Sequence, residues 1–171
     1  MRKIKIILLF ICFSGNIVHA QIDNPTDNNI STNYQANKEK KNIEKLAKEI
    51  KEIWYKNPFQ GTKIIAKKDV SYLIGVGMTT FSHRKTTNTL NRVASIRARN
   101  EVLKRLNGVT QTSSSDIITS EKITGSSVTY YETYLEKISE NANGFVQGMD
   151  VLTTFKSKDG RDYVYIIYKK L

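Results

Sequence analysis

The sequence is poor in the side chains on which thiol, metal and histidine chemistry depend. It holds 1 cysteine and 2 histidines among 171 residues. A disulfide within the chain is excluded, because it needs two cysteines. Cleavage of a signal peptide after Ala20 would remove Cys12 and His19 and leave His83 as the last histidine. Cys–His or Ser–His–Asp catalysis would then depend on His83, which lies in the polar segment FSHRKTT and is interpreted as a solvated loop residue.

Signatures of nucleotide and metal sites are missing as well. In the segment YLIGVGMTTF, Gly75 and Gly77 stand two apart, but Thr80 occupies the position of the third glycine of a dinucleotide-binding loop. Metal sites need several ligands close together, which one histidine does not supply. We therefore expect no cofactor, no metal and no enzymatic activity. A carboxylate pair can come from distant positions in a chain, so a secreted hydrolase stays open as an alternative.

The first residues, 1–20, predict a secretory signal peptide. Three basic residues precede the apolar run 6–13, and the segment VHA ends at Ala20. This order is that of a Sec-dependent signal, and the run is too short for a membrane-spanning helix, which takes about 20 residues. We expect export to the bacterial periplasm or outer envelope, with cleavage near Ala20. An uncleaved anchor and lipidation of Cys12 stay open as alternatives, although Ile11 stands where a lipid-acceptor cysteine is preceded by a small residue.

The charge balance is strongly positive, with 27 Lys and Arg against 16 Asp and Glu, which gives +11. Residues 1–20 hold 3 of the basic residues and no acidic one, so the remaining chain carries 24 − 16 = +8. Such a charge favours contact with anionic polymers, such as lipopolysaccharide or acidic glycans. Aromatic residues do not interleave with the basic ones as they do in single-strand binders, so specific nucleic-acid binding is not expected. The candidate contacts are His83, Arg84, Lys85, Arg92, Arg97, Lys104 and Arg105.

Beyond the signal the chain divides into three parts. Residues 21–37 are polar and predict a flexible tether. Residues 38–57 repeat apolar side chains at helical spacing and predict an amphipathic helix that ends before Pro58. We expect this helix to lie on the following domain, with a partner helix or contact with a membrane surface as alternatives. Residues 59–171 form the domain.

The domain pattern predicts an α+β fold, with one long helix packed on a curved, mainly antiparallel sheet and the amphipathic helix before it. Asp159-Gly160 between two β-rich runs is typical of a hairpin. The segment 128–138 fits both a strand and a helix, and its Tyr and Thr content favours a strand. The expected elements are strands at 63–66 and 71–81, a helix at 88–106, extended segments at 109–124 and 128–138, and hairpin strands at 151–155 and 163–168.

Small residues indicate how the long helix meets the sheet. Ala94 and Ala98 recur on its apolar side and would lie close over Gly75 and Gly77. Arg99 falls within the same apolar sector, so we expect it to extend its side chain to solvent or to pair with a carboxylate such as Asp150 or Glu132. The residues with an expected structural role are Gly75, Gly77, Ala94, Ala98, Arg99, Gly108 at the helix end and Gly160 in the hairpin turn.

Several segments resemble a known family. A strand ending GVGM, a helix of the type ASIRARNEVLKRL, Thr- and Ser-rich strands and a last strand DGRDYVYIIYK are similar to the small membrane-associated lipoproteins that include flagellar outer-ring assembly proteins. The resemblance covers about residues 70–171. It implies an envelope-located α+β domain of the lipoprotein type with a structural or adhesive role and no catalytic residues. The chain departs from the family in lacking a convincing lipid-acceptor cysteine, and no functional residue is carried over.

These observations predict a non-enzymatic, exported cell-envelope protein that docks on another envelope component. Docking would use the sheet or the basic helix face, with binding of an anionic envelope polymer as one alternative and a secreted hydrolase as another. A purely structural subunit of a larger assembly is a third possibility. The candidate face for a protein partner is Tyr-rich and comprises Tyr130, Tyr131, Tyr134, Tyr163, Tyr165 and Tyr168.

Overall fold

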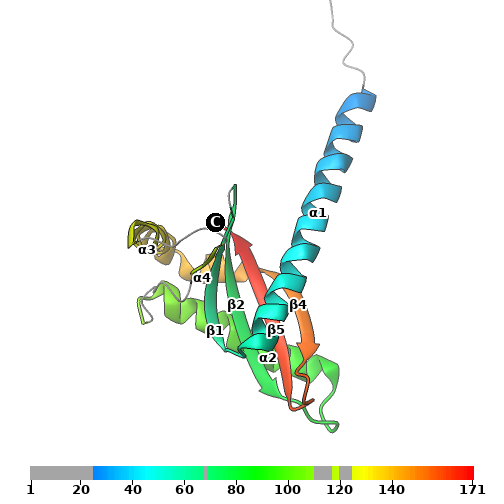
Figure 1. Cartoon of the computed structure of the whole chain (residues 1–171), viewed down its shortest axis with the longest axis vertical. Helices are drawn as coiled ribbons and strands as arrows, with labels where there is room; N and C mark the ends of the chain where they lie inside the picture. Colours follow the sequence, from blue (N-terminus) through cyan, green and yellow to red (C-terminus); the bar gives the residue numbers. More distant parts are fainter. Residues whose placement is uncertain (1–24, 68, 110–116, 120–124) are drawn as a thin grey trace, which may run out of the picture. The chain divides into compact units, whose positions relative to one another are not determined.

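The computed structural model describes residues 25–67, 69–109, 117–119 and 125–171. The predicted signal peptide and most of the segment 109–124 lie outside these ranges. Within them the chain has an α+β fold, as the sequence predicts (Figure 1). Its elements are α1 (Pro25–Lys56), β1 (Gly61–Ala66), β2 (Ser71–Thr80), α2 (Thr87–Leu106), β3 (Ile117–Thr119), α3 (Gly125–Ser139), α4 (Ala142–Gln147), β4 (Asp150–Lys156) and β5 (Asp162–Lys170).

The chain divides into two compact units, residues 1–39 and 40–171. In the first unit the described residues belong to α1, and those from Tyr34 onward are exposed. The polar composition of residues 21–37 predicts a flexible tether, whereas α1 begins at Pro25, so that 25–37 are helical. Proline is a common first residue of a helix, because no N–H is needed at that position. The polar composition of the segment therefore did not prevent helix formation.

The second unit is built on a sheet in the order β3-β1-β2-β5-β4. Among the described strands only β1 and β3 run parallel, and the other pairs are antiparallel, as expected. The longest pairing joins β2 to β5, from Tyr72 opposite Lys170 to Thr80 opposite Asp162. Residues near Thr80 and residues near Asp162 therefore lie at the same end of the sheet.

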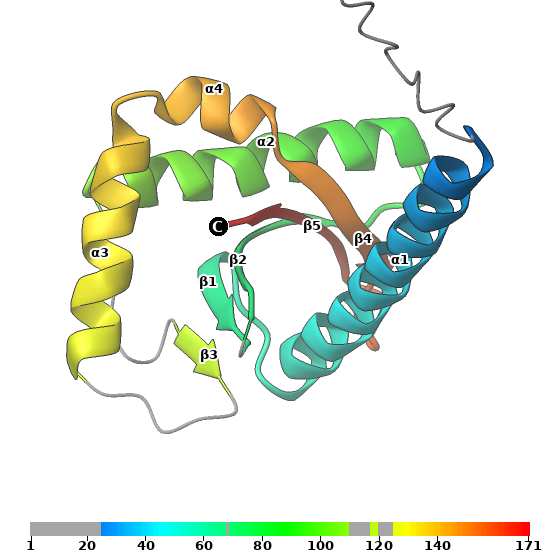
Figure 2. The same ribbon diagram turned by 90° about the horizontal axis from the view of Figure 1, so that it is seen from above.

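Helices cover both faces of this sheet (Figure 2). On one face, Ile74 and Val76 of β2 pack with Leu46 and Ile50 of α1. On the other face, Leu73 of β2 packs in a separate core with residues of α2, α3 and α4. The apolar stripe of the amphipathic helix thus lies on the domain, which was the favoured expectation for residues 38–57.

The long helix α2 approaches the sheet closely where β2 carries glycines. A Cβ atom on Gly77 would overlap the backbone of both Ala94 and Ala98, which are fully buried. At Gly75 a Cβ atom would lie 2.5 Å from Cγ2 of Val102. The predicted close approach of helix and glycines is confirmed, since only residues without side chains leave room for the helix backbone.

Two predicted turn glycines have the left-handed conformation. Gly108 follows α2 and Gly160 lies in the turn between β4 and β5, and both have φ of +70°. A residue with a Cβ atom is strained at this φ, and glycine is not. The end of the long helix and the final hairpin therefore lie where the sequence places them.

The segment 128–138, predicted as a strand, belongs to helix α3. Tyr131 and Leu135, four residues apart, are buried in the core, whereas Tyr130 is 63% exposed. The helical spacing of Val128, Tyr131, Leu135 and Ile138 thus decided the structure. The strand preference of Tyr and Thr depends on context, and packing against α2 and α4 outweighed it.

Arg99 of α2 is half-buried and has a partner other than the expected ones. Its Nη1 donates a hydrogen bond to the carbonyl oxygen of Val146 at 3.4 Å. Val146 lies near the C-terminal end of α4, a six-residue helix that the sequence analysis does not foresee. The C-terminal carbonyls of a helix attract cations, which explains this contact without Asp150 or Glu132.

Candidate anion-binding site

The seven basic residues predicted to contact an anionic polymer do not form one surface. Arg105 is only 4% exposed, and its Nε donates a hydrogen bond to Oγ1 of Thr62 at 3.1 Å. The prediction for Arg105 is therefore wrong. Its position on the outer side of a single helix suggested exposure, but β1 lies against the C-terminal part of α2 and buries it.

Two more of these residues are exposed but bound within the domain. Nη1 of Arg97 donates to the carbonyl oxygen of Met78 at 2.7 Å, and Nζ of Lys104 lies 3.0 Å from Oε1 of Glu101. Met78 lies beyond Val76, which is opposite the first residue of β1, so its carbonyl needs a partner from elsewhere. Arg92 is exposed on α2. Basic side chains of this helix face thus make part of their contacts within the domain.

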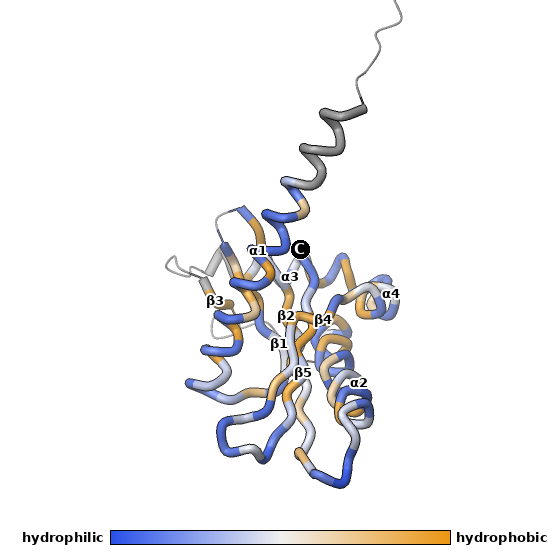
Figure 3. The backbone as a smooth tube through the Cα atoms, turned by 90° about the vertical axis from the view of Figure 1, so that its right-hand side faces the viewer, coloured by the Kyte–Doolittle hydropathy of each residue, from blue (hydrophilic) through white to orange (hydrophobic). Residues whose placement is uncertain are grey.

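The remaining predicted residues lie at one end of the sheet, where a second basic segment joins them. His83, Arg84 and Lys85 follow β2, and the turn from β4 to β5 brings further cations to the same end. Figure 3 shows both turns as hydrophilic segments. We call this surface the cationic tip. It consists of His83, Arg84, Lys85, Lys156, Lys158 and Arg161, all of them exposed.

Direct contacts hold the two halves of the cationic tip together. The N–H of Phe81 donates to the carbonyl oxygen of Arg161 at 2.7 Å. The ammonium group of Lys156 lies 3.7 Å from the centre of the Phe81 ring, and the His83 ring meets that ring edge-on at 5.2 Å. Phe81 therefore contacts both the loop, through His83, and the hairpin, through Lys156 and Arg161. A depression of about 540 Å³ opens here, lined by Thr80, Phe81, His83, Asp159, Gly160, Arg161 and Asp162.

The hairpin turn is held by its own carboxylate. Asp159 accepts hydrogen bonds from Oγ of Ser157 at 2.5 Å and from the backbone N–H of Arg161 at 3.1 Å. Nε of Arg161 donates to its other oxygen at 2.6 Å. The hydrogen bond from Ser157, followed by those from Arg161, lowers the pKa of Asp159 from 3.8 to about 2. Asp159 is therefore ionised at neutral pH and orients Arg161 within the tip.

Aromatic residues support the tip from the side of α1. Tyr55 donates its hydroxyl hydrogen to the carbonyl oxygen of Lys156 at 3.2 Å, and its ring meets Phe155 at 5.2 Å. The ammonium group of Lys158 lies 5.0 Å from the centre of the Tyr55 ring. Lysines placed over aromatic faces keep their charge at the surface while their stems pack.

The charge of the tip is clearly positive. Residues 81–85 and 156–162 hold five Lys or Arg side chains and two carboxylates, Asp159 and Asp162, which gives 5 − 2 = +3 without His83. Sequence reasoning found the loop half and missed Lys156, Lys158 and Arg161. The signal that could have found them was the predicted hairpin, because its turn had to lie beside one end of another strand.

The six tyrosines predicted as one partner face are divided among three places. Tyr130, Tyr131 and Tyr134 belong to α3, and the other three belong to β5. On β5, Tyr163 and Tyr165 pack on the side of α2, while Tyr168 packs on the side of α1. The prediction of a single Tyr-rich face is therefore wrong. The segment 128–138, predicted as a strand, is a helix, and the side chains of β5 alternate between two covered faces of the sheet.

Two other kinds of site are absent from the described residues. No group of three His, Cys, Asp or Glu side chains within them is placed to hold a metal ion. No helix in the described ranges has the length and apolar character needed to cross a membrane. Comparison with models of known families, with curated proteins and with solved structures finds no match for this chain.

Proposed function

We propose that the protein is a non-enzymatic, exported envelope protein that docks on an anionic polymer through the cationic tip. The observation that carries this proposal is the meeting of two basic segments, 83–85 and 156–161, more than 70 residues apart in the chain. Each segment alone is a short basic turn. Together they present several cations on one exposed end, and such clusters attract polyanions at long range.

The placement of the tip supports docking through an end of the sheet. Helices cover both faces of the sheet, so neither face is available in the way the sequence analysis expected. The tip consists of turns attached to the paired strands β2, β5 and β4, which form a rigid base. The envelope location in this proposal is supported by the predicted signal at residues 1–20 and by the resemblance to small membrane-associated lipoproteins.

The ligand chemistry is a chain of phosphate or carboxylate groups, which lipopolysaccharide and acidic glycans both supply. The test measures co-sedimentation of the protein with vesicles that contain lipopolysaccharide, and retention of soluble polygalacturonate, at low and high salt. We expect binding that weakens as salt rises, because salt screens exposed charges. Binding in the first experiment alone would assign the ligand to the lipid-borne polymer, and binding in the second alone would assign it to a free acidic glycan.

Charge reversal identifies the surface. We expect Arg84→Glu with Lys85→Glu, and separately Lys156→Glu with Lys158→Glu, to weaken binding about thirtyfold or more, at about 1 kcal/mol for each lost cation. The matched control is Lys40→Glu with Lys41→Glu, which makes the same charge change at exposed positions of α1. If the control weakens binding as much as the tip variants do, net charge rather than the tip is responsible and the proposal fails.

The non-enzymatic part of the proposal has its own test. Purified protein is incubated with polygalacturonate and with peptidoglycan, and the chain length of the product is measured. We expect unchanged chain lengths. Shortening of either polymer without added cofactor would instead support a hydrolase with a carboxylate pair.

A further inference from the structure

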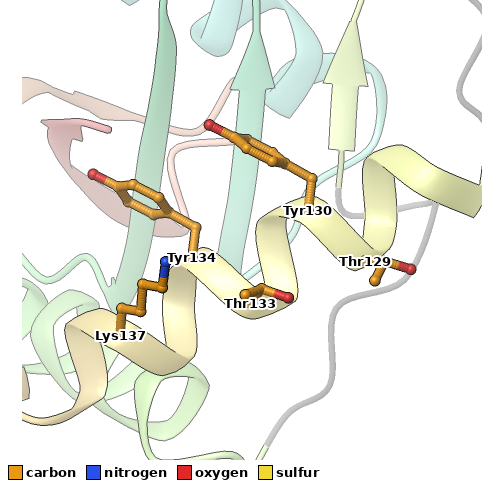
Figure 4. A pocket seen from close by; sticks show the side chains of 5 residues that line it. All are labelled: Thr129, Tyr130, Thr133, Tyr134 and Lys137. Carbon is orange, nitrogen blue, oxygen red and sulfur yellow. The ribbon is translucent and has the colours of Figure 1, made fainter.

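A second exposed site lies on α3, at the other end of the sheet from the cationic tip. The rings of Tyr130 and Tyr134 project from the same side of α3, with their centres 6.5 Å apart and their planes 29° apart (Figure 4). This spacing follows from the rise of four helical residues, about 6 Å. Tyr130 is 63% exposed, and Tyr134 is half-buried. The two rings lie one after the other along the surface of the helix.

The neighbouring residues hold this aromatic pair in place. Tyr131 and Leu135 are buried in the core below, and the hydroxyl of Tyr131 lies 2.7 Å from Oγ of Ser71 at the start of β2. The ring of Tyr131 meets that of Tyr130 edge-on at 5.1 Å. The pair thus lies on a helix anchored to the sheet, and rigid support of this kind lowers the entropy cost of binding.

Two depressions meet at the pair. One of about 520 Å³ is lined by Thr129, Tyr130, Thr133, Tyr134 and Lys137, and Figure 4 shows these side chains. The other, of about 300 Å³, is lined by Lys67, Asp69, Val70, Ser71, Tyr130, Tyr131, Tyr134 and Leu171. Hydroxyl groups, an ammonium group and a carboxylate therefore surround two aromatic rings. A ligand that fits has apolar faces and many hydrogen-bonding groups around its edge.

The charged side chains that line the two depressions are balanced, unlike those of the cationic tip. Nζ of Lys67 lies 2.6 Å from Oε2 of Glu49, so its charge is neutralised within the fold. Lys137 and Asp69, both exposed, then contribute one charge of each sign. This balance favours a neutral ligand over an anion.

We propose that the aromatic pair Tyr130–Tyr134 binds a neutral glycan with N-acetylated pyranose rings. The C–H faces of a pyranose ring pack on aromatic rings, and its hydroxyl groups match the hydroxyls and the ammonium group at the edge. The acetamido group adds a methyl group that packs on a phenol ring. It also adds an N–H that donates a hydrogen bond to the carboxylate of Asp69. The proposal goes beyond the proposed function, because the tip lies near Thr80 and this site near Ser71, roughly 25–30 Å apart along β2.

The test is a titration of the isotope-labelled full chain with chitohexaose, followed by NMR chemical shifts of the backbone amides. We expect saturable shifts in residues 129–137 and around 69–71. Tyr130→Ala should weaken binding about tenfold, since it removes one packed ring. Tyr130→Phe, which keeps the ring, should stay within about fivefold of the original affinity. The matched control, Tyr34→Ala, removes a similarly exposed tyrosine from α1 and should leave the affinity unchanged.

Three outcomes would overturn the proposal: no shifts with chitohexaose, shifts that map to the cationic tip, or an unchanged affinity in Tyr130→Ala. The folding of each variant is checked by its amide spectrum in the absence of glycan, and Tyr130→Ala is not expected to unfold because the side chain is mostly exposed. The result is independent of the proposed function. The variant Lys156→Glu with Lys158→Glu should bind chitohexaose normally even though it loses the anionic polymer.

Discussion

The two faces of the sheet are packed in opposite ways, although the same strands supply both. Along β2, Gly75 and Gly77 face α2, whereas Ile74 and Val76 face α1. On the α2 face the helix backbone occupies the space that side chains would need. On the α1 face large side chains from both elements fill the gap. The position of α2 is therefore determined by backbone contact and that of α1 by side-chain volume, and the two faces should respond differently to substitution.

Buried polar residues follow the same division. The buried polar or charged residues of the described chain are Thr62, Thr79 and Arg105. Thr62 lies opposite Gly75, and Thr79 lies two residues after Gly77, so both face α2, which carries Arg105 itself. The face of the sheet toward α2, which we call the close face, thus combines small residues with hydrogen bonds of fixed geometry. The α1 face relies on apolar contact, which tolerates small displacements better.

The largest effect is expected from a side chain placed between β2 and α2. Gly77→Ala should lower the free energy of unfolding by about 4 kcal/mol or more, because its Cβ would overlap the backbone of Ala94 and Ala98 and the helix cannot move without losing its other contacts. Gly75→Ala is the matched comparison. Its new Cβ lies 2.5 Å from the side chain of Val102 but no closer than 3.1 Å to the backbone, at the oxygen of Ala98, and we expect about 1–2 kcal/mol. Urea unfolding measures both, and equal losses would contradict a closer backbone approach at Gly77.

On the α1 face, the informative change removes volume. Ile50→Ala should cost about 3 kcal/mol, since Ile50 is fully buried between α1 and the sheet. Ile43→Ala, at a half-buried position of the same helix, should cost less than half of that. The same urea series measures these two variants. Equal costs would mean that the stripe of α1 is packed evenly rather than centred on Ile50.

The sequence predicts the close face better than it predicts the elements around it. Glycines and alanines at matched spacing have one simple structural explanation, and Gly75, Gly77, Ala94 and Ala98 meet as expected. The residues 128–138 fit both the periodicity of a strand and that of a helix. Only the long-range packing of Tyr131 and Leu135 selects the helix. At residues 25–37, polar composition suggested a tether, yet composition alone does not exclude a helix that is continuous with a packed one.

The candidate site was predictable only in part, for a related reason. Arg84 and Lys85 are neighbours in the chain and can be recognised as a basic turn. Lys156 and Arg161 join them through the pairing of β2 with β5, which depends on the order of strands in the sheet. Arg105 shows the reverse error, since a helical pattern does not reveal which neighbour covers the outer side of the helix end. Contacts between elements distant in the sequence thus determine which basic residues are exposed and which lie together, and local sequence patterns do not show this.

A smaller effect should come from the polar contact of the close face. Thr62→Val keeps the shape of the side chain but removes the oxygen that accepts a hydrogen bond from Nε of Arg105. A buried donor of a charged group then loses an acceptor, and we expect a cost of about 2 kcal/mol. Thr154→Val, at an exposed position of β4, should change the free energy of unfolding by no more than about 0.5 kcal/mol. A negligible effect at Thr62 would mean that volume alone determines packing on this face.

The smallest effect concerns the hairpin of the cationic tip, where Asp159 binds Ser157 and Arg161. Because the pKa of Asp159 is lowered from 3.8 to about 2 on folding, its carboxylate contributes stability above pH 3.8 and loses that contribution as the pH falls toward 2. Asp159→Asn should therefore speed amide hydrogen exchange of Gly160 at neutral pH and make little difference near pH 2. Hydrogen exchange followed by NMR at both values measures this. An equal effect at both values would show that the amide replaces the carboxylate poorly for reasons of shape, and that the ionised form does not hold the turn.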